Sequence, residues 1–145
     1  MTTISPEFDL DAAIASPIKR LFAFFIDVFL VWGIAIAVSI GSFGVGFLDF
    51  GGLLLVVDLI YRIATISTGS ATWGMRMLGI GLRDKNGQKF DLTAASLHTI
   101  AFYIVLASVI IQFASALMML GTERRQGLHD VLLGSVMVNA DFDEV

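Results

Sequence analysis

Five residues that can carry charge lie within or beside long apolar segments of this sequence. They are Arg20, Asp27, Asp58, Arg62 and His98. An ionised group at the centre of a membrane segment costs about 3 kcal/mol, so such residues usually have partners or a function. Two interpretations follow: an ion-pair network that fixes the packing of helices, or a site that binds a cation or a proton.

Three apolar segments are long enough to position these residues in a bilayer. They cover roughly residues 21–42, 47–66 and 97–120. About 20 helical residues cross a hydrocarbon layer, and backbone groups in lipid must be hydrogen-bonded within their own segment. The third segment, about 36 Å long as a helix, is long enough for one crossing only. The sequence therefore predicts an all-α membrane protein, a three-helix transmembrane bundle.

The composition supports a membrane protein and excludes several other classes. Of the 145 residues, 57% are hydrophobic and 15% are charged, against about half and a quarter in soluble domains. The net charge of −4 and the scattered basic residues show no nucleic-acid footprint. There is no cysteine, two histidines are too few for a familiar metal site, and no activated nucleophile accompanies the His129–Asp130 pair. We expect no enzyme, no catalytic residue, no cofactor and no metal.

The distribution of lysine and arginine predicts a cytoplasmic N-terminus. Lys19 and Arg20 precede the first segment, four basic residues lie between the second and third, and the connection 41–50 has none. This orientation places about six basic residues inside, with Arg124 and Arg125 outside.

In this orientation the charged residues reach similar depths. Asp27 lies about 10 Å from the inner boundary and Asp58 about 12 Å from it. Asp58 and Arg62 are four residues apart, which places them on one helix face, and Arg20 lies two turns from Asp27. We expect an intramembrane polar cluster in the cytoplasmic half, made of Arg20, Asp27, Asp58, Arg62 and His98.

The second connection contains a turn signal. Asn86-Gly87 supplies the positive φ of a tight hairpin. We expect residues 82–83 and 88–90 on either side of it to form a short β-ribbon.

The chain divides into three parts. Residues 1–16 form an acidic N-terminal tail, 17–138 the transmembrane domain, and 139–145 an acidic C-terminal tail. We expect both tails to be mobile.

Small residues form a stripe on the first predicted helix. Gly33, Ala37 and Gly41 are spaced four residues apart, so another backbone can approach there closely. Two interpretations stay open: packing within the chain, or a docking face for a second copy or a partner subunit.

The sequence also resembles the RDD family of bacterial membrane proteins over about residues 16–138. Residues 20–27 are similar to the family's Arg-x-x-Ala-x-x-Ile-Asp motif, and 72–84 to its Thr-Pro-Gly-Lys-Arg-x-x-Gly segment. Residues 125–130, followed by 134–138, resemble its C-terminal signature. The residues that carry the resemblance are Arg20, Asp27, Gly74, Arg76, Gly79, Arg125, Gln126, His129 and Asp130.

The Arg and two Asp that name the family correspond to Arg20, Asp27 and Asp130. The sequence departs from the pattern at Trp73, where Pro is usual, and at His98, where Arg often begins the third helix. A role that needs a permanent cation at the second position is therefore not carried over.

The resemblance further implies a C-terminal strand that could pair with residues 80–82 if both lie on one side of the membrane. Three spans place them on opposite sides, and we expect three spans.

Two functional hypotheses follow. The first is an accessory or scaffolding subunit of a membrane complex, because three helices packed on small residues leave no lumen. The alternative is a monovalent cation/proton exchanger that works as a homo-oligomer through Asp27 and Asp58, an activity proposed for some members of the family that the chain resembles.

The expected partners are the lipid bilayer and a membrane protein or a second copy. The resemblance implies a multi-pass protein of the bacterial inner (plasma) membrane.

Overall fold

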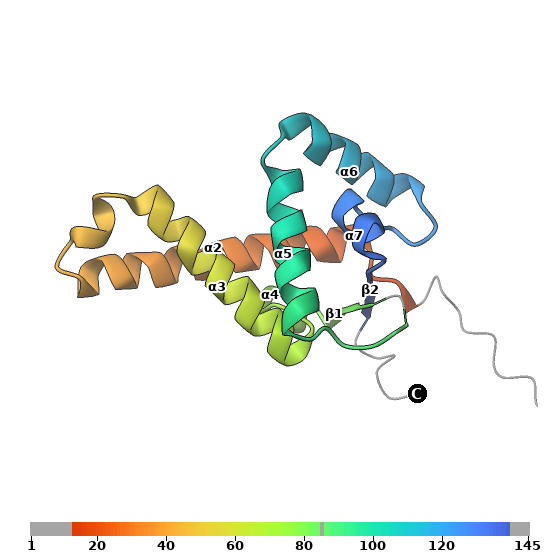
Figure 1. The fold of residues 1–145 in the computed structure, drawn as a ribbon, viewed down its shortest axis with the longest axis horizontal. Coiled ribbons are helices and arrows are strands. Elements are labelled where there is room, and N and C mark those ends of the chain that lie inside the picture. Colours follow the sequence, from red (N-terminus) through yellow and green to blue (C-terminus); the bar gives the residue numbers. More distant parts are fainter. Residues whose placement is uncertain (1–12, 85, 140–145) are drawn as a thin grey trace, which may run out of the picture.

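A long helical hairpin is the most extended part of the computed structural model, which describes residues 13–84 and 86–139 (Figure 1). Its arms are α2 (Pro17–Gly41) and α3 (Phe50–Gly69), joined through the short 3₁₀ helix η1 (Val45–Phe47). Both arms are long and apolar enough to cross a membrane. These two predicted spans are therefore helices, with ends close to those expected.

Local capping sets the ends of the hairpin arms. Ser16 accepts a hydrogen bond from Lys19 N at 3.3 Å, and Pro17 occupies the first helical turn, where its missing N–H does no harm. Asp49 caps α3 by accepting from Gly52 N at 3.0 Å. Asp49 therefore serves as a helix cap at the loop end of the hairpin.

The third apolar segment is two helices and not one. These helices are α5 (Leu92–Leu106) and α6 (Val109–Gly121), and the chain bends by 114° between them. Ser108 leaves the helical conformation, and its hydroxyl accepts from Ile111 N at 3.4 Å as the cap of α6. The prediction of one continuous helix over 97–120 is wrong, because a serine inside the apolar run can start a new helix. Residues 13–84 and 86–139 thus contain two membrane-length helices, or three spans if the bent pair counts as one.

A small sheet joins parts of the chain that are far apart in sequence. β1 (Ile80–Arg83) and β2 (Val136–Asn139) pair antiparallel, with Ile80 opposite Asn139 and Arg83 opposite Val136. Two short helices, α4 (Trp73–Met77) and α7 (Leu128–Leu133), precede the two strands. The C-terminal strand implied by the family resemblance is present, and it lies beside the second connection.

The predicted β-ribbon has the wrong partner. The turn itself exists: Asp84 Oδ1 accepts from Asn86 N at 2.8 Å and from Gln88 N at 2.7 Å. Residues 88–90, however, form no strand, and β1 pairs with β2 instead. A turn signal fixes where the chain reverses, but it does not determine which segment completes the sheet.

Part of the predicted N-terminal tail belongs to this sheet region. Residues 1–12 and 140–145 of the predicted tails lie outside the described residues. Ala13, Ile14 and Ala15 are buried, and Ala15 N donates to Met137 O at 2.9 Å. The tail prediction for 13–16 is therefore corrected: these residues pack against β2 and lead into the Ser16 cap.

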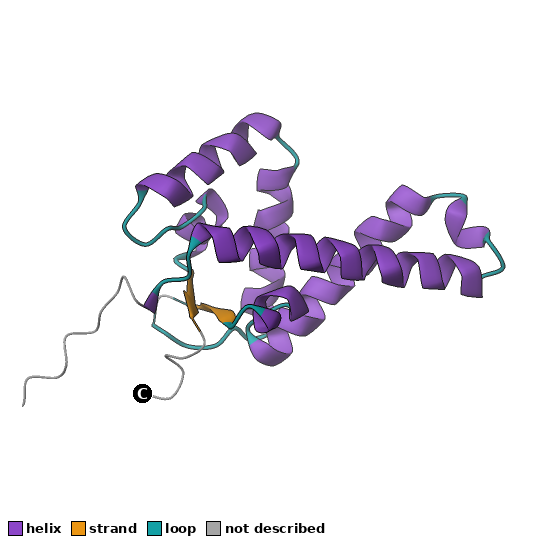
Figure 2. Cartoon of the chain, turned by 180° about the vertical axis from the view of Figure 1, so that it is seen from behind, coloured by secondary structure: helices purple, strands orange, loops and turns teal. Residues whose placement is uncertain are grey.

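The buried core lies at one end of the hairpin. It gathers around α4, the sheet and the start of α5, while the loop end of the hairpin projects away from these elements in both views (Figures 1 and 2). Large apolar side chains on the projecting part are exposed, for example Phe29 and Leu48. The core residues are Ala15, Ala23, Ile66, Ala71, Met75, Ile80, Leu82, Phe90, Ala95 and Met137.

Candidate functional site

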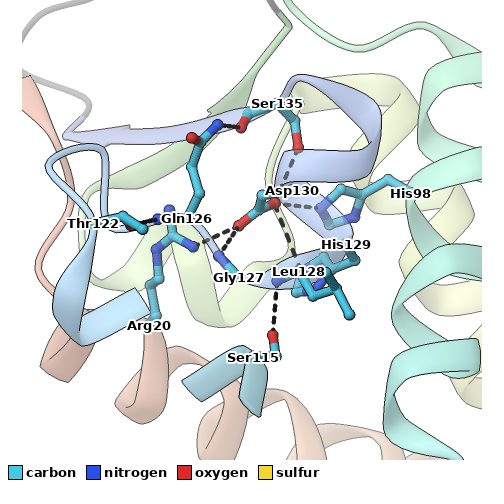
Figure 3. Close-up of polar contacts among 10 residues, drawn as sticks. All are labelled: Arg20, His98, Ser115, Thr122, Gln126, Gly127, Leu128, His129, Asp130 and Ser135. Atoms are coloured by element: carbon cyan, nitrogen blue, oxygen red, sulfur yellow. Dashed lines mark hydrogen bonds and ion pairs between the residues drawn. The ribbon is translucent and has the colours of Figure 1, made fainter. Parts of the chain in front are cut away.

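A fully buried aspartate, Asp130, connects three helices (Figure 3). Its Oδ2 accepts from Arg20 Nη1 at 2.7 Å and from Gly127 N at 3.3 Å. Its Oδ1 lies 3.1 Å from His98 Nε2 and accepts from Ser135 Oγ at 3.0 Å. The partners come from α2, α5 and the two ends of α7, so one carboxylate holds all of them together.

The short helix α7 presents Asp130 through close packing on α6. Leu128 N donates to Ser115 Oγ at 2.9 Å. A Cβ on Gly127 would lie 2.9 Å from the same Ser115 oxygen, so the approach of the two helices requires glycine there. Gln126 Nε2 donates to Ser135 O at 2.5 Å and ties the two ends of α7 together.

The charge state of this group follows from its surroundings, and α7 lies outside the membrane-length helices. Burial alone would raise the pKa of Asp130, but the hydrogen bond to His98 and the charge of Arg20 outweigh it and lower the pKa well below its usual range. Burial lowers the pKa of His129 to about 4, although the neighbouring Asp130 acts in the opposite direction. At neutral pH Asp130 is therefore ionised and His129 is neutral.

Asp27 has a separate set of partners. It accepts from Tyr61 Oη at 2.6 Å, from Thr72 Oγ1 at 2.6 Å and from Gly74 N at 2.8 Å. Thr72 is also the cap of α4, so the carboxylate sits at the positive end of that helix. A Cβ on Gly74 would lie 2.3 Å from Ala23 O, which means that α4 approaches α2 as only glycine allows.

A third polar group joins α3 to α5. Arg62 Nε donates to Asp58 Oδ2 at 2.9 Å, the i,i+4 arrangement that the spacing suggests. Tyr103 donates its hydroxyl to the same Asp58 oxygen. The Arg62 guanidinium also lies 4.7 Å from the centre of the Phe102 ring.

Contrary to what their depths suggested, the five charged residues do not share one hydrogen-bonded network, although Arg20, Asp27, Arg62 and His98 line one cavity. Arg20 and Asp27 share the buried face of α2, yet Arg20 pairs with Asp130. Among the described residues, no hydrogen bond or ion pair joins Asp27 to Arg20 or to Asp58. The correction has a physical reason: depth along a helix fixes height in the membrane but not the direction in which a side chain points. His98 joins Arg20 at Asp130, and Asp58 keeps Arg62.

The remaining residues of the predicted family signature lie in the segments that lead to the two strands. Arg76 donates to Thr65 O at 3.0 Å and to Ala71 O at 3.2 Å, at the carbonyl end of α3. Gly79, with φ +62, allows the turn into β1. Arg125 has φ +48 in the loop before α7.

The stripe of small residues points away from the rest of the chain. Gly33, Ala37 and Gly41 are all exposed, and a Cβ on either glycine would meet nothing within 4 Å. Internal packing of α2 uses the opposite stripe, Ala23, Asp27, Val31, Ala35 and Ser39.

Sequence reasoning did not single out the hydroxyl donors of these aspartates. They are Tyr61, Thr72, Tyr103 and Ser135. The sequence did offer an indication for Tyr61 and Tyr103. The chain has only two tyrosines beside 12 phenylalanines, and both tyrosines lie in apolar segments. A buried tyrosine hydroxyl needs a partner, and an aspartate in a neighbouring helix is the natural acceptor.

A cavity of about 350 Å³ is lined by Arg20, His98 and His129, the residues next to Asp130. Its walls come from α2, α3, α5 and α6, and its polar rim includes Arg20, Arg62, His98 and His129. The rest of the wall is largely apolar, with Leu21, Phe24, Ile66, Phe102, Ala116, Met119 and Leu120.

Two imidazoles and one carboxylate come close enough to be considered as metal ligands. His98, His129 and Asp130 bring ligand atoms within 4.8 Å of one another. The carboxylate, however, already accepts from several donors, and the Arg20 guanidinium nitrogen lies 2.7 Å from it. A divalent ion would have to share this space with a fixed positive charge, so the geometry favours a hydrogen-bonded hub over a metal centre.

Gly74→Ala should destabilise the protein by about 1–3 kcal/mol, since the added methyl group has to push α4 away from Ala23 and Asp27. Gly33→Ala is the matched control, because open space surrounds Gly33 and alanine favours a helix by up to about 1 kcal/mol. Thermal unfolding in detergent checks both variants. Equal effects at the two positions would contradict the close approach.

Stability in detergent should fall as the pH is lowered from about 6.5 towards 4. Unfolded His129 takes up a proton near pH 6.5, whereas the folded protein keeps it neutral down to about 4, so acid favours the unfolded state. The full window is worth about 3 kcal/mol, at about 1.4 kcal/mol per pKa unit. Unfolding midpoints between pH 7 and 4.5 measure the slope, and His129→Gln should flatten it. An unchanged slope in that variant would assign the effect to another group.

Comparison with known proteins agrees with the resemblance seen in the sequence. The RDD family matches residues 14–134, which is most of the chain. None of the curated proteins and none of the solved structures matches. With two apolar helices of membrane length and a family match that includes Arg20, Asp27 and Asp130, this chain is a membrane protein and belongs to the RDD family.

Proposed function

We propose that the chain is an accessory or scaffolding subunit of a complex in the bacterial inner membrane. The observation that carries this proposal is the use of its aspartates. Asp27, Asp58 and Asp130 each accept hydrogen bonds from other helices of the same chain. Charges that are committed in this way fix helix packing, as expected of a subunit whose work is to hold a shape.

The face that such a subunit would offer lies on α2. Gly33, Ala37 and Gly41 expose bare backbone on the projecting hairpin, and the described chain leaves this face uncovered. Helix association in lipid depends on close packing, which small residues permit. A transmembrane helix of a partner is therefore the favoured occupant of this stripe.

The proposed topology is a two-span hairpin with a re-entrant α5–α6 pair on the cytoplasmic side. Pairing of β1 with β2 supports it, since both strands must lie on one side of the membrane. The basic residues support it as well: none of the nine lysines and arginines falls in the loop 42–49. Arg124 and Arg125 then join the other basic residues inside, in better agreement with the positive-inside rule than three straight spans.

The alternative, a monovalent cation/proton exchanger, has one observation in its favour, because Asp27 lines the cavity. The rest of the geometry weakens it. Asp27 already accepts from three donors, and both Arg20 and Arg62 on the same cavity are already paired with carboxylates. Among the described lining residues, no uncommitted carboxylate is left for a cation. We therefore rank the exchanger second.

Single-cysteine labelling tests the topology, because the natural chain has no cysteine. In intact spheroplasts a membrane-impermeant maleimide should label Leu48→Cys, while Gln88→Cys and Glu123→Cys should react only after permeabilisation. All three positions are exposed. Labelling of Glu123→Cys together with Leu48→Cys would show that α5 and α6 cross the membrane, and the re-entrant arrangement would be abandoned.

Purification in mild detergent tests the subunit role. We expect the wild-type chain to retain a larger membrane protein, and the double variant Gly33→Leu/Gly41→Leu to lose it, since leucine keeps the helices apart. Gly51→Leu is the matched control, because Gly51 is exposed in open space on α3. A pure homo-oligomer that couples a cation gradient to proton flux in proteoliposomes would favour the exchanger instead.

A further inference from the structure

We propose that the cavity beside Asp130 binds the anionic head group of a membrane lipid, with Arg20 as its main contact. The inference goes beyond the subunit role and does not depend on it. It starts from a guanidinium group that is buried but only partly used.

Arg20 uses only one edge of its guanidinium group for hydrogen bonding within the described residues. Its Nη1 donates to Asp130, whereas Nε and Nη2 are buried and have no hydrogen-bond partner among the described residues. The residue is only 8% exposed and lines the cavity. A buried donor without a partner is unfavourable, so the edge formed by Nε and Nη2 is suited to acceptors from outside the described residues.

The free edge has the geometry of an oxyanion site. The Nε and Nη2 hydrogens of arginine are parallel and match two oxygens of a phosphate or carboxylate. His129 Nδ1 is also buried and has no hydrogen-bond partner within residues 13–84 and 86–139, and His129 lines the same cavity. The ligand therefore carries at least two acceptor oxygens at its polar end.

Free hydrogen-bond donors, and not the net charge around the cavity, favour an oxyanion there. Arg20 and Arg62 line it, and Asp27 is the one carboxylate among the lining residues. Asp27 is already held by Tyr61, Thr72 and Gly74, so its charge is compensated by donors. Because Asp130 and Asp58 balance the two arginines, the directed hydrogen bonds to Arg20 decide the specificity.

The walls select an amphiphile over a free ion. Apart from the polar rim, the lining is apolar, and α6 contributes Ala116, Met119 and Leu120. Gln112 and Ser115, the only polar side chains within α6, both face this cavity. A volume of about 350 Å³ lies at the lower end of the range for ligand sites. It holds a head group and the first part of its chains, while the remaining chains stay in the bilayer.

Lipid titration of the delipidated full-length chain tests this site, with native mass spectrometry as the readout. Phosphatidylglycerol should bind at least about tenfold more tightly than phosphatidylcholine with the same acyl chains, a difference of about 1.4 kcal/mol. The choline cation of the second lipid cancels the negative charge of its phosphate, so its head group is not a net anion. Equal affinities for the two lipids would overturn the proposal, and competition by inorganic phosphate at similar concentration would show a free-anion site and overturn the lipid assignment.

Two variants on one helix locate the binding. Ala116→Phe fills the cavity from an exposed wall position and should weaken phosphatidylglycerol binding about tenfold or more. Ala114→Phe adds the same bulk at an exposed position that does not line the cavity, and should leave binding unchanged. Equal affinities in these two variants would place the lipid elsewhere on the protein.

A third variant tests the arginine edge. Arg20→Lys keeps the charge but removes the bidentate geometry, so phosphatidylglycerol binding should weaken about tenfold or more. Unchanged binding in a folded Arg20→Lys protein would overturn the role of Arg20. If this variant does not fold, the alanine pair on α6 still decides whether the cavity is the site.

Discussion

A carboxylate that is removed from water stays ionised only where donors surround it, and this requirement organises the closed end of the molecule. Asp130 meets it with donors from α2, α5 and the segments that flank α7. Removing one partner of such a buried pair leaves an uncompensated charge, which typically costs about 3–5 kcal/mol. Arg20 and Asp130 are 110 residues apart in sequence, so their pairing closes nearly the whole described chain into one unit.

Asp27 extends the same principle to the small sheet. By accepting from Thr72 and Gly74 it holds the start of α4 against α2, and α4 leads directly into β1. β1 in turn pairs with β2, which follows α7 and therefore Asp130. Asp27 and Asp130, the two family aspartates, thus hold the helices that precede the two strands of one sheet. The bend between α5 and α6 is what allows α7 to return to this place.

The molecule consequently has two ends with different physical characters. One end is a polar, hydrogen-bonded assembly in which α6 covers a cavity beside Arg20. The other is an apolar hairpin whose exposed surface suits lipid or another helix. A polar base and a projecting apolar hairpin are the features on which the proposed subunit role rests.

The sequence by itself determined the features that depend on near neighbours: the two hairpin helices, the Asp58–Arg62 pair, the turn at 84–88 and the family. Apolar length, i,i+4 spacing and turn residues report only on contacts within a few residues. Tertiary structure decided the rest. Whether Ser108 stays in a helix or caps a new one, and whether β1 pairs with 88–90 or with 136–139, depends on which distant segment buries more surface and satisfies more hydrogen bonds. The same holds for Arg20, which shares a helix face with Asp27 but pairs with Asp130. The direction in which its side chain points is set only in the folded chain.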